Sequence, residues 1–566
     1  MVRAFTDRRS LATGALALVG VISVGLSAAA ALAQPADAAR QPGSPRGGLI
    51  AQMTAFKTDV PARSIDIVLV RPTRSSIGVS VACYQKQPQE GYVEFRRDDA
   101  SPITTTAVQP LPHGTPVLFA LEGLSPDTAY VYRVRYRPAA GGDRSAGEYV
   151  STEYFTFHTP RASGNGAGFT FTIQADSHLD QGVEPKVYEQ TLANMLAAKP
   201  DFMIDLGDTF MTDKRGKDFK GALAQYDAQR YYFSRVAHSV PLFMVLGNHD
   251  GEKGTSGNGA DDIGPWSFAQ RTSRFPAPVT GAGPPGAGVP IGFYSGSTTM
   301  KDGAGSNYYA FEWGDALFSV LDPYWSTTDR IRGGGGGGYR GAGGGARGDG
   351  AGGMNGQRPG DEPLKPTDSS WTSTLGRTQY DWLARTLEGT QAKYRFVFIH
   401  HLVGGMGGTE SRGGVASSPY FEWGGKNADG SLGFAEHRAG WAMPIHDLLV
   451  KHHVSAVFHG HDHLYVNSQR DGLVYQCVPQ PGNPRGNTRS ATQYGYTSGT
   501  LHGSPGHVRV RVEAEKATVE FVRTALADAP NGHARGDRRG DGRDGGEANA
   551  AIVHSYTIAP AGAAQP

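Results

Sequence analysis

Cysteine is nearly absent from this chain, since only Cys83 and Cys477 occur among its 566 residues. So few thiols exclude a small-domain scaffold that is held together by several disulfides. The two cysteines could pair in an oxidising compartment, but they fall in different predicted domains. We therefore expect two unpaired, buried thiols.

Net charge and long apolar runs are scarce as well. The chain is formally +1, and loss of an N-terminal segment with Arg3, Asp7, Arg8 and Arg9 removes three positive charges and one negative charge, which leaves −1. A near-neutral balance gives no basic footprint for nucleic acid. After residue 33, no run approaches the ~18–20 apolar residues that a membrane span needs. The length and the 39% hydrophobic content predict at least two cores, and no feature indicates an oligomeric state.

The N-terminus indicates export from the cytoplasm. Arg8-Arg9-Ser10-Leu11 precedes a stretch rich in Gly, Ala, Val and Leu that ends in Ala31-Leu32-Ala33, a small-x-small cleavage pattern. The paired arginines resemble a twin-arginine export signal, and an ordinary secretory signal with two incidental arginines is the alternative. Both alternatives predict a signal peptide over residues 1–33 and an exported protein, periplasmic or extracellular.

Residues 60–160 predict a separate all-β domain. Short β-rich runs are divided by Pro, Gly, Asp and Ser, as a sandwich requires. The runs are Ile65–Val70, Ile77–Tyr84, Tyr92–Phe95, Val117–Leu121, Tyr130–Tyr136 and Tyr154–His158. The segment Leu124–Tyr130 resembles the fibronectin type III signature before the penultimate strand, with Tyr130 as the corner tyrosine.

Five short polar segments in residues 168–525 each follow an apolar run. The segments are Asp176-Ser177-His178, Gly207-Asp208, Gly247-Asn248-His249-Asp250, His400-His401 and Gly460-His461-Asp462-His463. The runs before them are Phe169–Ala175, Phe202–Leu206, Leu242–Leu246, Phe396–Ile399 and Val454–Phe458. Such runs are typical of buried parallel strands, and ligands of open α/β sheets bind just outside the carboxyl ends of the strands. The pattern therefore predicts that these polar groups meet at one edge.

The five segments resemble, in order, the signature of the calcineurin-like metallophosphoesterase superfamily: D-x-H, G-D, G-N-H-[DE], H and G-H-x-H. The resemblance implies a four-layer α/β/β/α sandwich, and purple acid phosphatase-like members carry a similar N-terminal β domain. It also implies two divalent or trivalent metal ions. One ion would be held by Asp176, His178, Asp208 and His463, and the other by Asp208 as the bridge, Asn248, His400 and His461.

The purple acid phosphatase branch has a tyrosine three residues after the bridging aspartate. This chain has Met211 there, so we expect an ordinary Mn, Fe or Zn pair rather than a tyrosinate-ligated iron. The residue types agree with that expectation, because mixed imidazole, carboxylate and carbonyl ligands suit these metals and no thiolate stands at the motif positions. Two ions about 3.5–4 Å apart clamp the attacking and leaving oxygens of a phosphoryl displacement and make hydroxide available near neutral pH.

The leaving oxygen also needs a proton donor. His249 is the first candidate, with Asp250 orienting its ring, although Asp250 could instead cap the next helix. His401 is the second candidate, although it could simply face the core. Any one of these histidines alone could be structural, but the ordered set favours a metal site.

The rest of this region alternates helices with strands, which favours β-α-β units in layered sheets. The helical spacings are Val183–Ala198, Phe219–Ala237, Thr378–Leu387 and Pro444–His452. We also expect a hairpin over Tyr308–Trp313 and Leu317–Leu321. Closing strands are expected over Leu473–Val478, Val508–Val512 and Ala517–Val522. A Gly-rich insertion, Gly333–Gly353, and a tail over residues 526–566 are of low complexity. The insertion could hang near the metal edge or be a surface loop.

These features predict a secreted, dinuclear metal-dependent hydrolase of small-molecule phosphoesters. We expect a phosphomonoesterase of acid phosphatase type. The alternatives are a phosphodiesterase or nucleotide pyrophosphatase, and a non-catalytic surface-binding protein that uses the β domain and the glycine tract. His401, with Arg412 or His437, could donate to the oxygens of a monoester, whereas Pro419–Trp423 could form an aromatic wall for a base or another flat group.

Overall fold

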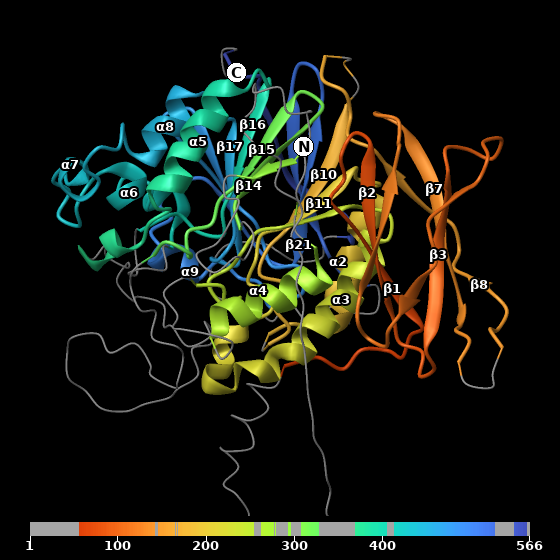
Figure 1. Cartoon of the computed structure of the whole chain (residues 1–566). Coiled ribbons are helices and arrows are strands. Elements are labelled where there is room, and N and C mark those ends of the chain that lie inside the picture. The colour runs from red at the N-terminus through yellow and green to blue at the C-terminus, as the bar shows by residue number, and fades with distance from the viewer. Residues whose placement is uncertain are drawn as a thin grey trace, which may run out of the picture. The chain divides into compact units, whose positions relative to one another are not determined.

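The computed structural model describes residues 56–562 with internal gaps, and Figure 1 shows the arrangement of its elements. The gaps are residues 142–144, 165, 167, 181, 254–261, 277, 279–292, 296–306, 328–367, 405–411 and 527–547. The predicted signal peptide and the Gly-rich insertion lie outside the described residues. In the part of the chain that is described, no helix is both long and apolar enough to cross a bilayer.

The first part of the described chain is all-β, as the sequence predicts. One antiparallel sheet has the order β1-β2-β6, and a second is built on β3 and β7, with β4 and β5 paired to β3 and β8 and β9 paired to β7. The bounds are β1 Ile65–Val70, β2 Ser76–Cys83, β3 Gln89–Arg96, β4 Thr104–Thr105, β5 Gln109–Leu111, β6 Val117–Glu122, β7 Ala129–Pro138, β8 Val150–Ser151 and β9 Phe155–His158. Both sheets bury their inner residues in one core. We call this part the β sandwich.

Tyr130 lies where the fibronectin-like pattern predicts a corner tyrosine. Its hydroxyl accepts a hydrogen bond from the backbone N–H of Ser125 at 2.8 Å, five residues upstream. This contact supports the predicted fibronectin type III relationship, which stays a prediction.

Two further sheets follow the β sandwich. Within the described residues, a six-stranded sheet has the order β12-β11-β10-β21-β22-β23, and an eight-stranded sheet has the order β13-β14-β15-β16-β17-β19-β18-β20. The bounds of the first are β10 Phe169–Gln174, β11 Phe202–Asp205, β12 Leu242–Met244, β21 Gly506–Val512, β22 Ala517–Arg523 and β23 Ile552–Ile558. Those of the second are β13 Phe293–Ser295, β14 Tyr309–Trp313, β15 Ala316–Val320, β16 Tyr394–Phe398, β17 Ala456–His459, β18 Leu464–Arg470, β19 Leu473–Cys477 and β20 Thr500–Gly503.

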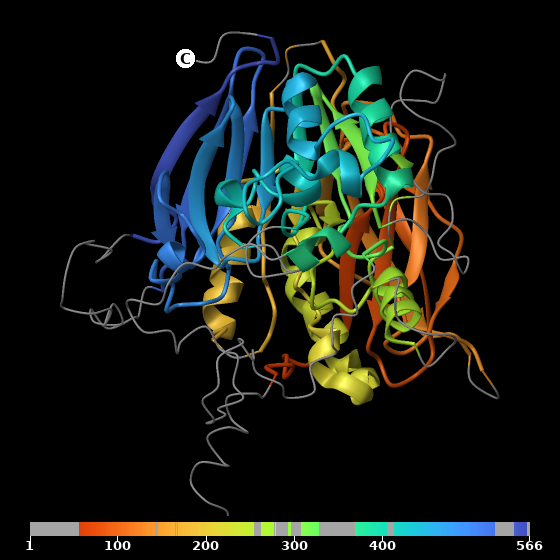
Figure 2. The same cartoon turned by 90° about the vertical axis from the view of Figure 1, so that its left-hand side faces the viewer.

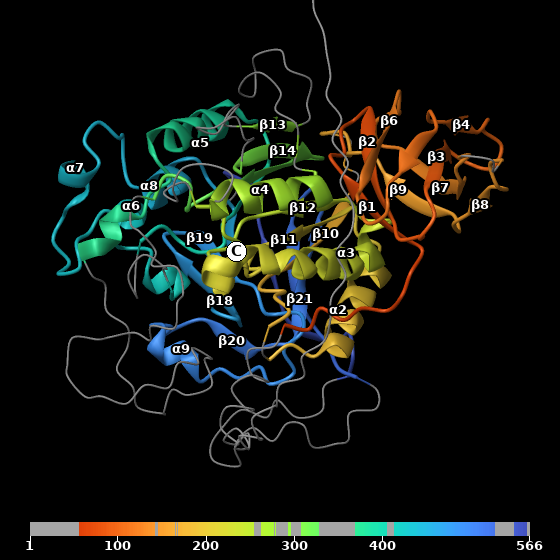
Figure 3. The same ribbon diagram turned by 60° about the horizontal axis from the view of Figure 1, so that its bottom comes forward.

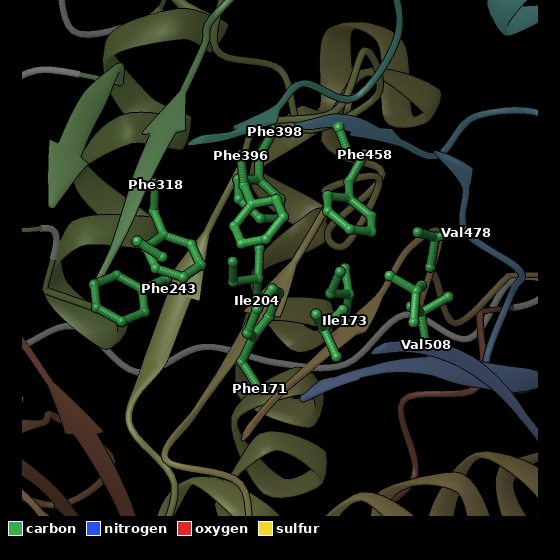
Figure 4. Packing of buried hydrophobic residues seen from close by; sticks show 14 of the residues in the cluster. Phe171, Ile173, Ile204, Phe243, Phe318, Phe396, Phe398, Phe458, Val478 and Val508 are labelled. Carbon is green, nitrogen blue, oxygen red and sulfur yellow. The ribbon is translucent and has the colours of Figure 1, made fainter. Parts of the chain in front are cut away.

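Aromatic side chains fill the space between these two sheets (Figure 4). Phe171 of β10 packs on Phe318 of β15 with ring centroids 5.1 Å apart and on Phe396 of β16 at 5.7 Å. Phe202 of β11 lies 5.1 Å from Phe318. Both faces of these strands are buried, which explains why each strand is a continuous apolar run in the sequence.

Helices cover the outer faces of both sheets. On the six-stranded sheet, α2 and α3 pack against β11 and β12, and on the eight-stranded sheet α5 and α8 pack against β15, β16 and β17. The helix bounds are α2 Pro185–Ala197, η1 Thr212–Ala222, α3 Leu223–Ala237, α4 Ile263–Arg274, η2 Asp368–Thr372, α5 Arg377–Gly389, η3 Gly414–Ala416, α6 Phe421–Gly424, α7 Phe434–His437, α8 Ile445–Lys451 and α9 Ser490–Gln493. This arrangement confirms the predicted α/β/β/α fold class (Figure 2).

One prediction about the C-terminal part is wrong. Residues 526–566 were expected to be a low-complexity tail, but β23 pairs antiparallel with β22 and forms the edge of the six-stranded sheet. Ile558 is fully buried and Tyr556 packs against the inter-sheet core, so this strand has its own apolar anchor. The expectation about the thiols is confirmed, because Cys83 and Cys477 are both free and buried.

Candidate metal centre

The predicted ligands stand directly after strands whose carboxyl ends face one another across the two sheets. Asp176, Asp208 and Asn248 follow the parallel strands β10, β11 and β12. On the other sheet, His400 follows β16, and the segment with His461 and His463 follows β17. The two sheets therefore deliver the five motif segments to one edge, as the sequence predicts.

Six of the predicted ligands form two adjoining clusters. Asp176, His178 and His463 make one, and Asp208, His400 and His461 make the other; within each, the potential ligand atoms lie within 4.8 Å of one another. His463 Nε2 lies 3.1 Å from Asp176 Oδ1, and His400 Nε2 lies 3.3 Å from Asp208 Oδ2. His400 Nε2 is also 3.9 Å from Asp176 Oδ1, which joins the two clusters.

The backbone of the site is strained at the ligands. Asp176, Asp208, His461 and His463 have φ values of 57°, 56°, 71° and 59°, in the left-handed region that non-glycine residues rarely adopt. Each such residue costs on the order of 1–3 kcal/mol, and such strain gathers where function requires it.

The segments after β11 and β12 also approach each other very closely. A Cβ at Gly247 would stand 2.0 Å from the backbone nitrogen of Asp208, so only glycine fits there.

Several buried polar atoms at the centre lack a hydrogen-bond partner among the described residues. They are Asp176 Oδ1, Asn248 Oδ1, His400 Nε2 and His461 Nε2. Burying such atoms without compensation costs free energy. Nitrogen and oxygen lone pairs that converge in this way fit divalent ions such as Zn, Fe or Mn. His400 supports this interpretation, because its Nδ1 donates to the carbonyl of Leu206 at 2.7 Å and leaves Nε2 for the centre.

A carboxylate that no motif identifies also orients His178. Asp180 forms an ion-pair contact with His178 Nδ1, and Lys214 Nζ lies 2.6 Å from the other oxygen of Asp180. A carboxylate on the second ring nitrogen fixes the orientation of a ligating histidine and raises its basicity. The motifs do not identify Asp180. Its place two positions after His178, the last residue of the D-x-H segment, is the feature that could have pointed to it.

His249 is oriented by Asp213 and not by Asp250. Nδ1 of His249 donates to the two carboxylate oxygens of Asp213 at 3.0 and 3.1 Å. Burial alone would lower the pKa of His249, but the carboxylates of Asp213 and Asp208 outweigh it and raise that pKa to about 8. The ring is therefore held in place, and the two carboxylates favour its protonated form. Asp213 lies on η1, outside every motif, so no sequence pattern identifies it.

The predicted roles of Asp250 are wrong. Its carboxylate accepts hydrogen bonds from the backbone N–H groups of Gly247, Asp208, Thr209 and Phe210, at 2.8, 3.1, 2.8 and 2.8 Å. Those four donors occupy it fully, so it neither orients His249 nor caps a helix. It ties the turn after β12 to the turn after β11.

The structure favours the second proton-donor candidate, His401, less than His249, and its role stays a prediction. The ring is buried, and its Nδ1 donates to the carbonyl of Leu402 at 2.9 Å. Burial, together with the charge of His400, lowers the pKa of His401 to about 3. A neutral ring whose one proton is held by a carbonyl is a poorer proton donor than His249.

The predicted specificity residues Arg412 and His437 have different outcomes. Arg412 lies at the centre, because its Nη1 donates to the carbonyl of His461 at 2.7 Å and pairs with Asp462 at 3.4 Å. His437 instead lies on the solvent-exposed helix α7, where its ring stacks on that of Trp371 with the ring centroids 4.4 Å apart.

Two of the three rings in the aromatic wall predicted over residues 419–423 are not available to a substrate, whereas Tyr420 is half-buried. Phe421 and Trp423 are buried in the protein core, and the indole N–H of Trp423 donates to the hydroxyl of Tyr475 at 2.9 Å. These rings therefore cannot stack on a substrate base.

The sequence of residues 169–465, more than half of the chain, matches the family model described as calcineurin-like phosphoesterase. The chain belongs to this family, and it is a metallophosphoesterase. Members of the family bind divalent metals, which agrees with the two clusters.

Two solved structures show the same fold. The purple acid phosphatase PPD1 from seeds of yellow lupin, Lupinus luteus, is 13% identical with a TM-score of 0.51, over 88% of this chain and 74% of that one. The structure of PhoD is 14% identical with a TM-score of 0.53, over 82% of this chain and 88% of that one. No curated protein matches the chain in sequence.

Proposed function

We propose that the protein is a dinuclear-metal phosphomonoesterase that acts on small-molecule phosphoesters after export from the cytoplasm. The observation that carries this proposal is the convergence of two buried ligand clusters joined by Asp176 and His400, whose nearest ligand atoms lie 3.9 Å apart. Among the described residues, Asp176 Oδ1, His400 Nε2 and His461 Nε2 have no hydrogen-bond partner. The predicted signal peptide is the support for export.

Asp208 is the proposed bridge between the two ions. One ion would take Asp176, His178, Asp208 and His463, and the other would take Asp208, Asn248, His400 and His461. When bound, the pair supplies Lewis acidity towards the phosphoryl oxygens and a nucleophile at neutral pH. Met211 is buried at the position where a tyrosinate ligand would stand, so Mn, Fe or Zn fits the donor set.

His249 is the proposed proton donor. Asp213 holds its Nδ1, which leaves Nε2 to give a proton to the leaving oxygen of the ester. A pKa of about 8 keeps that proton on the ring at neutral pH and lets it leave readily. Asp213 acts through the imidazole and is therefore a positioning residue.

Cationic side chains around the centre favour a monoester. Arg412 contacts His461, Lys214 pairs with Asp180, and Lys253 lies 3.9 Å from Asp213. A monoester dianion gains more from such charges than a diester monoanion does. The diesterase alternative has less support, because two of the three rings that were expected to bind a base, Phe421 and Trp423, are buried.

Replacement of the bridging residue tests the proposal. Asp208→Ala removes the one carboxylate that is proposed to contact both ions, so metal and activity should be lost together. Elemental analysis of the purified protein and hydrolysis of nitrophenyl phosphate measure the two losses. Asp218→Ala, an exposed carboxylate on η1, is the control. Two bound ions and normal activity in Asp208→Ala would disprove the assignment of Asp208 as the bridge. A wild-type protein that binds no metal and hydrolyses no phosphoester would favour the non-catalytic binding protein.

A further inference from the structure

A single buried amide connects the two turns that carry the first ligands. Gln229 lies in the middle of α3 and is fully buried. Its Nε2 donates to the carbonyl of Ser177 at 2.9 Å and to the carbonyl of Thr209 at 3.0 Å. Ser177 stands between the ligands Asp176 and His178, and Thr209 directly follows Asp208. Both turns are therefore held by the two hydrogens of one NH2 group.

The orientation of this amide is fixed by its other atom. The hydroxyl of Tyr188 on α2 donates to Gln229 Oε1 at 3.3 Å, and that hydroxyl in turn accepts from Gln174 Nε2 at 3.1 Å. Carbonyl oxygens can only accept, so the NH2 group must face Ser177 and Thr209. The amide is fully satisfied, and a buried network of this kind is rigid.

The helix that carries Gln229 is held from behind by the β sandwich. The next residue, Arg230, donates from Nη2 to the carbonyl of Ser80 on β2 at 2.8 Å. The hydroxyl of Tyr132 on β7 donates to the carbonyl of His238, just after α3, at 2.5 Å. Figure 3 shows α3 beside β11 on one side and beside β1 of the sandwich on the other. These contacts attach α3 to the β sandwich on the side away from the ligand turns.

We infer that Gln229 is a positioning residue that sets the separation between the turn with Asp176 and His178 and the turn with Asp208. The inference rests on the proposed function, since it requires that these turns hold metal ions. Each ion takes a ligand from at least one of the two turns, and Asp208 would contact both. A change in the separation should therefore weaken both ions together and alter the distance between them.

Gln229→Met tests the inference, because methionine has a similar length and helix propensity but no amide hydrogens. Equilibrium dialysis with Zn²⁺ should show both ions bound about 10–100-fold more weakly than in the wild type. In the Mn²⁺-loaded variant, electron paramagnetic resonance should show a diminished signal of the coupled pair. The matched control is Gln225→Met, one turn earlier on α3. Gln225 is equally buried, and its amide has no hydrogen-bond partner among the described residues.

Circular dichroism and the melting temperature of the metal-free protein show whether Gln229→Met folds. If it does not, Gln229→Asn keeps a carboxamide but withdraws it by about 1.5 Å, one carbon–carbon bond, and should weaken both ions as well. Wild-type affinity for both ions and an unchanged pair signal in a folded Gln229 variant would overturn the inference and leave the proposed function intact. A wild-type protein that binds no metal would overturn both.

Discussion

At the scale of single residues, the spatial neighbours of His249 decide its chemistry. Asp250 follows it in the sequence, but four backbone N–H groups take up that carboxylate. Asp213, thirty-six positions earlier, contacts the ring instead. A positioned acid with this pKa should contribute most where the leaving group is a poor one.

His249→Ala should lower kcat by about 10²–10⁴-fold for an alkyl phosphate while two metal ions stay bound. The loss should shrink for nitrophenyl phosphate, because a nitrophenolate leaves without protonation. Steady-state kinetics on both substrates, together with elemental analysis, measure this difference. Equal losses for the two leaving groups would exclude His249 as the acid.

Asp213→Asn should keep a hydrogen bond to His249 but remove the negative charge that raises its pKa to about 8. The pKa of the ring should fall towards its ordinary value of about 6.5. The ring would then lose its proton at a lower pH, so the alkaline limb of the pH profile of kcat should move to lower pH. Asp218→Asn, on the exposed side of η1, should leave the profile unchanged, and an unmoved limb in Asp213→Asn would contradict the positioning role.

At the scale of elements, long apolar runs were the reliable signal. The five strands before the motif segments are all present, because β10, β11, β12, β16 and β17 are buried on both faces. The edge strand β23 was missed because most of its residues are half-buried or exposed and it follows a Gly-rich tract. Asp213 and Gln229 were missed for another reason: their roles depend on contacts between distant segments, which neither spacing nor composition contains.

One strand of the six-stranded sheet should make stability depend on pH. His507 on β21 is fully buried, and neither ring nitrogen has a hydrogen-bond partner among the described residues. Burial, with a contribution from the charge of Arg509, lowers the pKa of His507 to about 3. The unfolded chain binds a proton at this histidine below about pH 6.5, whereas the folded protein does so only near pH 3. The free energy of unfolding should therefore fall as pH falls through this window.

At pH 5 the loss from this histidine should be about 2 kcal/mol. His507→Leu should remove that part of the dependence, so its urea midpoint should change less between pH 7 and pH 5 than the wild-type midpoint does. His113→Leu, at an exposed position of the β sandwich, serves as the control. Parallel curves for His507→Leu and the wild type would show that His507 does not titrate in this way.

At the scale of the whole molecule, the ligand turns are enclosed by elements from distant parts of the chain. Residues of both sheets supply the ligands, and α3 links the turns after β10 and β11 to the β sandwich. Arg412 contacts His461 and Lys214 contacts Asp180, although the two cationic residues lie far apart in the sequence. The charge that a substrate meets is therefore a property of the assembled fold.

That charge leads to a prediction about the ester class. With three cationic side chains near the centre and Phe421 and Trp423 buried, the metal-loaded enzyme should hydrolyse nitrophenyl phosphate with a higher kcat/KM than bis-nitrophenyl phosphate. ATP should be hydrolysed as well, since its terminal phosphate also carries more than one charge. Arg412→Met should reduce the preference for the monoester, because it removes a charge beside His461. A kcat/KM for the diester more than about tenfold above that for the monoester, about 1.4 kcal/mol of transition-state preference, would show that the centre is built for diesters.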